Sequence, residues 1–96
     1  MSAKRLRIAG SVQGVGFRDW MVRQASQLGV AGWVRNRGDG TVEALVTGDT
    51  AAVEELLRAC RRGPPGASVT LIHEDLVDPA EAADLDPRFQ RRPTQP

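Results

Sequence analysis

Residues 10–18, GSVQGVGFR, combine three glycines with an arginine, a combination suited to holding an anion. Glycine adopts positive φ at little cost, so Gly14 and Gly16 would let backbone N–H groups converge on one point. A helix that begins after this loop would add its free N–H groups and the positive end of its dipole. Arg18 would supply a permanently charged guanidinium that can bind two phosphate oxygens at once. The stretch therefore predicts a phosphate-binding loop, although a tight turn beside a solvated arginine would use the same residues.

The remaining residue types narrow the chemistry. The loop lacks the lysine of a Walker A motif, so nucleotide binding is not expected. With one histidine, His73, and one cysteine, Cys60, no catalytic triad can be assembled and a dedicated zinc site is not expected. We interpret His73 as an ordinary strand residue that could face either side of a sheet, and Cys60 as a core residue.

Three carboxylates are interpreted as structural. We expect Asp19 on a helix surface, Asp39 in a turn and Glu43 on a strand surface. Asp19 directly follows Arg18 and would repel a phosphate group, so its side chain is expected to point away from the loop. A site without a general base, nucleophile or metal can act only on an activated substrate, for which positioning and charge neutralisation suffice.

The composition is that of a single globular domain. The chain has 96 residues, of which 41% are hydrophobic and 26% charged, and this is enough for one modest core. The net charge of +1 indicates no general attraction to DNA or membranes. No apolar run approaches the roughly 18 residues of a membrane span, and the first ten residues lack the apolar segment of a signal peptide. A lone cysteine favours a reducing compartment. We therefore expect a cytoplasmic monomer without membrane or nucleic-acid partners.

The periodicity of apolar residues predicts the elements that position the loop. Strands are expected at residues 4–9, 30–36, 41–47 and 67–77. A first helix is expected from Phe17 to Leu28, followed by Gly29 as its C-terminal glycine. A second helix is expected to begin at a cap formed by Asp49 or Thr50 and to stop at the sequence RRGPPG. Their buried faces would carry Phe17, Trp20, Met21, Ala25 and Leu28 in the first helix, and Val53, Leu56, Leu57 and Cys60 in the second.

The order β-α-β-β-α-β matches the ferredoxin-like fold, an α+β sandwich with two helices on one face of an antiparallel sheet. A right-handed crossover makes the first two strands parallel, and the third strand lies between them. The C-terminal ends of the first two strands would then lie roughly 10 Å apart. This arrangement would bring the glycine loop and Arg18 close to Asn36, which ends the second strand.

The segment from Asp78 onward has a different character. It contains four prolines and an acidic stretch followed by arginines, and only Phe89 offers a core anchor. We expect a possible short fifth strand around Phe89. The domain is expected to span residues 1–92, with 93–96 as a disordered tail.

Three segments together resemble the acylphosphatase family. They are GSVQGVGFR at 10–18, LGVAGWVRNRGDGTVEA at 28–44 and RRGPPGASV at 61–69. The segments cover most of residues 6–72, and the first two are highly specific as a pair. The resemblance implies a ferredoxin-like fold and hydrolysis of the carboxyl-phosphate bond of acyl phosphates to a carboxylate and inorganic phosphate. Such a substrate suits a site without a base, because its leaving group is a stabilised carboxylate.

The resemblance also implies roles for single residues. Arg18 would bind the phosphoryl group and Asn36 would orient the attacking water. The expected phosphate-binding set is Ser11, Val12, Gln13, Gly14, Val15, Gly16 and Arg18. Ser11 stands where the family often has a basic residue. No metal or cofactor is expected, and phosphate would be both product and inhibitor. Small acyl phosphates, carbamoyl phosphate and aspartyl-phosphate proteins all present the same reacting group.

Two other function classes are considered. RNA-binding ferredoxin-like domains stack bases on aromatic residues of the central strands, and residues 4–9 and 41–47 contain none. A non-catalytic module, like the acylphosphatase-like segments of carbamoyl-transfer maturation proteins, stays open. Release of phosphate from benzoyl or acetyl phosphate in EDTA would separate an enzyme from a binding module.

Overall fold

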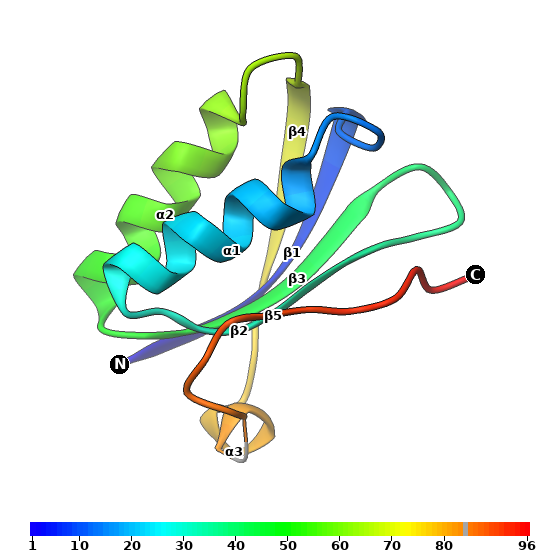
Figure 1. Ribbon diagram of the computed structural model, residues 1–96. Helices are drawn as coiled ribbons and strands as arrows, with labels where there is room; N and C mark the ends of the chain where they lie inside the picture. The colour runs from blue at the N-terminus through cyan, green and yellow to red at the C-terminus, as the bar shows by residue number, and fades with distance from the viewer. Residues whose placement is uncertain (84) are drawn as a thin grey trace.

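The structure, a computed structural model, describes residues 1–83 and 85–96 as a sheet with two helices packed on one face (Figure 1). The main strands are β1 (Ser2–Ser11), β2 (Ala31–Asn36), β3 (Val42–Gly48) and β4 (Ser68–Leu76). The main helices are α1 (Phe17–Leu28) and α2 (Thr50–Arg62), and the short elements are α3 (Pro79–Ala82) and β5 (Gln90–Arg91). The predicted ferredoxin-like order is confirmed, and only α3 was not expected.

The strand order in the sheet is β4-β1-β3-β2-β5. Because β3 pairs antiparallel with both β1 and β2, these two strands run parallel, as the crossover rule predicted. The sheet as a whole is mixed rather than antiparallel, since β5 pairs with β2 in parallel. This differs from the prediction for a simple reason. Strand β4 ends beside the start of β1, so the chain crosses that end of the sheet through α3 and enters β5 in the direction of β2.

Both main helices have the predicted limits, and their end residues explain why. Helix α1 follows Gly16 and ends at Gly29, where φ values of 78° and 72° in the left-handed region interrupt the helical backbone. Helix α2 is capped by Asp49, whose side chain accepts a hydrogen bond from the backbone N–H of Ala51.

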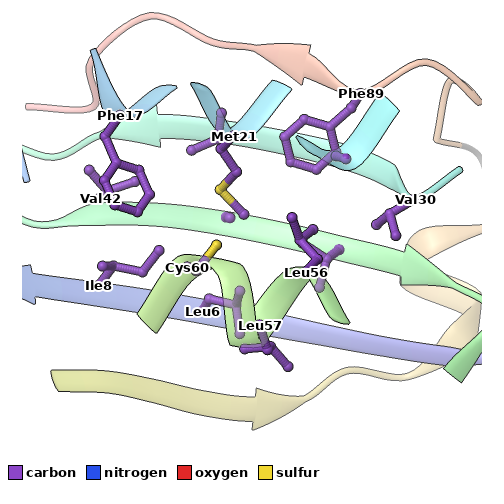
Figure 2. Close-up of a cluster of buried hydrophobic side chains, with 14 of the residues drawn as sticks. Leu6, Ile8, Phe17, Met21, Val30, Val42, Leu56, Leu57, Cys60 and Phe89 are labelled. Atoms are coloured by element: carbon purple, nitrogen blue, oxygen red, sulfur yellow. The ribbon is translucent and has the colours of Figure 1, made fainter. Parts of the chain in front are cut away.

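The core lies between the helices and the sheet (Figure 2). Phe17 and Met21 of α1 are buried against the sheet, and Phe89, just before β5, also belongs to the core. Cys60 is fully buried, and burial raises the pKa of its thiol to about 12, in agreement with its expected role as a core residue. His73 lies on the exposed side of β4, where its ring hydrogen-bonds to Asp75.

After β5 the chain continues beside β2, where Gln95 forms a parallel bridge with Arg37. The Gln95 N–H donates to the Asn36 carbonyl at 2.8 Å, and the Gly38 N–H donates to the Gln95 carbonyl at 2.8 Å. The expected disorder of residues 93–96 stays a prediction. A truncation of the tail would remove these hydrogen bonds of Gln95.

Within the described ranges, no helix has the length and apolar character needed to cross a membrane.

Candidate active site

The loop between β1 and α1 is built on two glycines in left-handed conformations. Gly14 has φ of 75° and Gly16 has φ of 78°. A Cβ placed on either residue would meet no atom within 4 Å, so the backbone conformation, and not crowding, calls for glycine. The same observation means that the space beside the loop backbone is open to a ligand.

The N-terminus of α1 has no side-chain cap, in contrast to that of α2. Helix geometry leaves the N–H groups of its first turn without partners inside the helix. In the part of the chain that the structure describes, the N–H groups of residues 14–16 donate to no other backbone group. Loop and helix therefore offer a continuous set of free donors at the positive end of a helix dipole, which is a favourable place for an anion.

A cavity of about 190 Å³ opens at this helix end. Its lining brings Arg18 together with Asn36, which lies 18 positions further along the chain at the end of β2. The residues that line it are Val12, Gly14, Gly16, Phe17, Arg18, Asp19, Asn36 and Arg91. Thus the two residues with predicted catalytic roles share one cavity with half of the predicted loop, while Ser11, Gln13 and Val15 do not line it.

These three residues have other positions. Ser11 is the last residue of β1 and pairs with Ser68 of β4, and Val15 packs against the hydrophobic core. The side-chain amide of Gln13 donates to the carbonyls of Arg37 and Thr41, both at 2.8 Å. Gln13 therefore ties the loop to the turn between β2 and β3, next to Asn36.

Asp19, whose side chain is expected to point away from the loop, is part of the cavity lining. Its carboxylate accepts a hydrogen bond from Arg91 at 2.8 Å. This bond holds the pKa of Asp19 below its ordinary value.

Sequence reasoning did not identify Arg91 as a site residue, although a signal was present. Side chains two positions apart in a strand point to the same face of the sheet. Phe89 faces the core under the helices, so Arg91 is directed toward the same side, where α1 carries Asp19.

The prediction that Glu43 lies on a strand surface is also wrong, because Glu43 is buried. Its side chain is only 5% exposed and forms ion pairs with Arg35 at 2.7 Å and with Arg37 at 3.2 Å. Burial by itself would raise the pKa of Glu43, but the two arginines outweigh this effect and the net shift is downward. Arg35 lies directly across from Glu43 in the neighbouring strand β2, one residue before Asn36, and Arg37 follows in the turn.

A second hollow, of about 310 Å³, lies over the strands on the other side of the sheet. Its arginines, Arg5 and Arg7, share the lining with the carboxylates of Glu43 and Asp75, which oppose an anion. The cavity at α1 combines an arginine with the free backbone donors of a loop and a helix N-terminus. Among residues 1–83 and 85–96, no three histidine, cysteine or acidic side chains cluster in a way that could hold a metal ion.

The family model and the curated relatives identify one family. The acylphosphatase family model matches residues 4–89. The chain is 62% identical over 94 residues to an acylphosphatase of Acidiphilium cryptum, covering 98% of this chain and 99% of that protein. It is 54% identical over 95 residues to an acylphosphatase of Rhodospirillum rubrum, with 98% and 99% covered. The crystal structure of an acylphosphatase from Bacillus subtilis matches with a TM-score of 0.88 at 36% identity, covering 96% of this chain and 99% of that one.

Proposed function

The chain belongs to the acylphosphatase family, and we propose that the cavity holding Arg18 and Asn36 is where it performs the family's reaction. The activity is hydrolysis of the carboxyl-phosphate bond of an acyl phosphate, which gives a carboxylate and inorganic phosphate. One observation supports this location most strongly. An arginine, an asparagine and an uncapped helix N-terminus, contributed by separate elements, line one small cavity.

The phosphoryl group would bind at the loop. Backbone N–H groups of residues 14–16 and of the first turn of α1 would donate to its oxygens, because they have no backbone partners of their own in the described structure. The Arg18 guanidinium would bind two oxygens in a bidentate arrangement. Together these groups neutralise the charge that the phosphoryl oxygens carry in both the ground state and the transition state.

Asn36 would hold the attacking water. Its side-chain amide can accept one hydrogen bond from the water and donate another, which fixes the orientation of an oxygen lone pair toward phosphorus. The water oxygen forms a bond to phosphorus while the bond from phosphorus to the acyl oxygen breaks. The electron pair of the broken bond leaves with the carboxylate. The proton of the water passes to a phosphoryl oxygen of the substrate.

No general acid is needed in this scheme, because the leaving carboxylate is stable and requires no protonation. No general base is needed either, because a phosphoryl oxygen of the substrate takes the proton of the water. Phosphoryl transfer depends mainly on positioning and on neutralisation of charge. The cavity offers both through groups whose positions are fixed by the start of α1 and by the end of β2.

Hydrolysis of benzoyl phosphate by the parent protein and by two variants tests the proposal. Arg18→Ala is expected to lose most of the activity together with affinity for inorganic phosphate, measured as an inhibitor or by calorimetry. Asn36→Ala is expected to lose most of kcat while phosphate still binds, as for an interaction made chiefly in the transition state. Normal turnover by Asn36→Ala, or unchanged phosphate affinity of Arg18→Ala, would show that the assigned roles are wrong.

We further propose that the protein works as a cytoplasmic monomer on small acyl phosphates. The buried, lone Cys60 suits a reducing compartment. The cavity of about 190 Å³ suits a small substrate better than a folded protein domain. Comparison of kcat/KM for acetyl phosphate and for an aspartyl-phosphate protein would distinguish the two substrate classes.

A further inference from the structure

The candidate site contains a charge that conflicts with its proposed ligand. Asp19 lies in the first turn of α1, directly after Arg18, and lines the cavity. An acidic residue in a first turn stabilises the helix, because it interacts with the positive end of the dipole. A phosphoryl group at the same helix end would use the same positive end, so the carboxylate and the ligand would repel each other.

Arg91 supplies a positive charge that pairs with Asp19 in the cavity lining. Its guanidinium donates a hydrogen bond to the Asp19 carboxylate at 2.8 Å, and both residues belong to the cavity lining. The pair joins α1 to β5, and its two residues are 72 positions apart in the sequence. Its position depends on Phe89, which is buried in the core two residues before Arg91.

We propose that Arg91 is a positioning residue for substrate binding, which neutralises Asp19 so that the phosphoryl group meets a cavity with a net positive charge. This inference rests on the proposed function. With Arg91 present, two arginines face one aspartate in the cavity lining. Without it, the charges of Arg18 and Asp19 cancel, and the phosphoryl group would meet a cavity lining with no net charge.

An ordinary surface ion pair is the competing explanation. The side chains of Arg91 and Asp19 are 47% and 57% exposed, and pairs of this kind add little to stability. A melting temperature therefore cannot separate the two explanations. Affinity for inorganic phosphate separates them, because only a charge within the cavity changes it strongly.

The experiment is a double-mutant cycle read out by the inhibition constant of inorganic phosphate and by KM for benzoyl phosphate. Arg91→Gln removes the positive charge and is expected to weaken phosphate binding about three- to tenfold, the scale of one unit charge acting across a solvated site. Asp19→Asn removes the negative charge and is expected to bind phosphate more tightly than the parent. The double variant restores the charge of the parent cavity and is expected to return to the parent affinity. The differences should shrink as salt is added.

Two further arms make the result decisive. Arg88→Gln is the matched control, since Arg88 lies in the same C-terminal segment, pairs with Asp86 and does not line the cavity. It is expected to leave both constants unchanged. Arg18→Ala tests the proposed function itself. If Arg18→Ala loses phosphate affinity but the parent and the three charge variants bind phosphate equally, or if Asp19→Asn fails to rescue Arg91→Gln, the role of Arg91 is wrong while the proposed site stands. If Arg18→Ala binds phosphate normally, the proposed site is wrong.

Discussion

At the scale of single residues, the proposed mechanism assigns contact with phosphate to Arg18 and contact with water to Asn36. Arg18 offers a flat guanidinium with several donors, whereas a lysine ammonium is a point charge. Asn36 offers an amide that both accepts and donates. These differences in shape and donor number, more than charge alone, determine what a conservative substitution can preserve.

Asn36→Asp is therefore a sharper test than alanine. The substitution keeps the size of the side chain, removes the amide donor and places a negative charge beside the phosphoryl group. We expect kcat for benzoyl phosphate to fall by on the order of 10² or more, the scale for loss of a well-placed polar group. The loss should equal or exceed that of Asn36→Ala. Substantial activity in the aspartate variant would contradict the proposed role of the Asn36 amide donor.

Arg18→Lys tests whether a positive charge without the planar guanidinium is sufficient. We expect little rescue relative to Arg18→Ala, both in kcat/KM and in phosphate inhibition.

Glu43 shows how one buried carboxylate supports the strand that carries Asn36. Glu43→Gln would leave Arg35 and Arg37 without their charged acceptor. Because hydrogen bonds to charged groups contribute more than neutral ones, we expect a loss of about 1–3 kcal/mol in the free energy of unfolding at pH 7. Urea denaturation measures this loss.

The effect of Glu43→Gln on the free energy of unfolding should depend on pH. The pKa of Glu43 in the folded protein lies below its ordinary value of 4.5, so its ionised form stabilises the folded state above that pH. This contribution is lost as the pH falls through the lowered pKa. The stability difference between the parent and Glu43→Gln should therefore narrow below about pH 4.5. A constant difference down to strongly acidic pH would exclude an ionised Glu43 as the cause.

At the scale of elements, the site depends on how the loop is joined to the β2–β3 turn. Gln13 makes this join through two hydrogen bonds to backbone carbonyls. Gln13→Ala should let the loop move relative to Asn36 while both groups remain present. We expect kcat to fall about tenfold, since small misplacements of reacting groups cost this much or more. Phosphate affinity should change less. Gln27→Ala, an exposed position of α1, is the matched control and should show neither effect.

Elements with a strong local signal could be predicted from the sequence. The spacing of Phe17, Met21 and Ala25 predicted α1, because one helix face must be buried, and glycines marked its ends. The meeting of Arg18 and Asn36 followed from the topology alone. Helix α3 was missed because it is a single turn, although Asp78 as a cap before a proline was a readable signal.

Contacts that depend on pairing across the sheet could not be predicted in the same way. Strand β5 has two residues and no periodicity, so the sequence only weakly indicates its parallel pairing with β2. The contact of Arg91 with Asp19 depends on that pairing and is equally weakly indicated. The burial of Glu43 depends on arginines contributed by a neighbouring strand and by the following turn. Alternation within one strand indicates which face a residue takes, but not how far its neighbours cover it.

At the scale of the whole molecule, the chemistry is expected to proceed without a metal. The proposed mechanism takes all of its positive charge from Arg18 and backbone donors. We expect the rate of acetyl phosphate hydrolysis in EDTA to equal the rate with added magnesium. Loss of turnover in the chelator, restored by magnesium or zinc, would contradict this prediction.

The C-terminal segment links the site to the stability of the whole fold, and truncation separates its parts. Ending the chain after Arg92 removes two hydrogen bonds of Gln95 with the backbone of Asn36 and Gly38. Residues 93–96 are exposed, so water can replace these bonds, and we expect melting temperature and turnover to stay nearly unchanged. A drop of many degrees would mean that the tail is an integral part of the sheet edge.

Ending the chain after Arg88 provides the contrast, because it also removes the buried Phe89 and the Arg91 partner of Asp19. Loss of a buried phenylalanine costs about 3–5 kcal/mol, which corresponds to a melting drop of roughly 10 °C or more in a domain of this size. Phosphate affinity should fall as well, since Asp19 would face the ligand without its arginine. If the two truncations gave the same melting temperature and phosphate affinity, Phe89 would not anchor the segment. The inference that Phe89 positions Arg91 at the cavity would then be wrong.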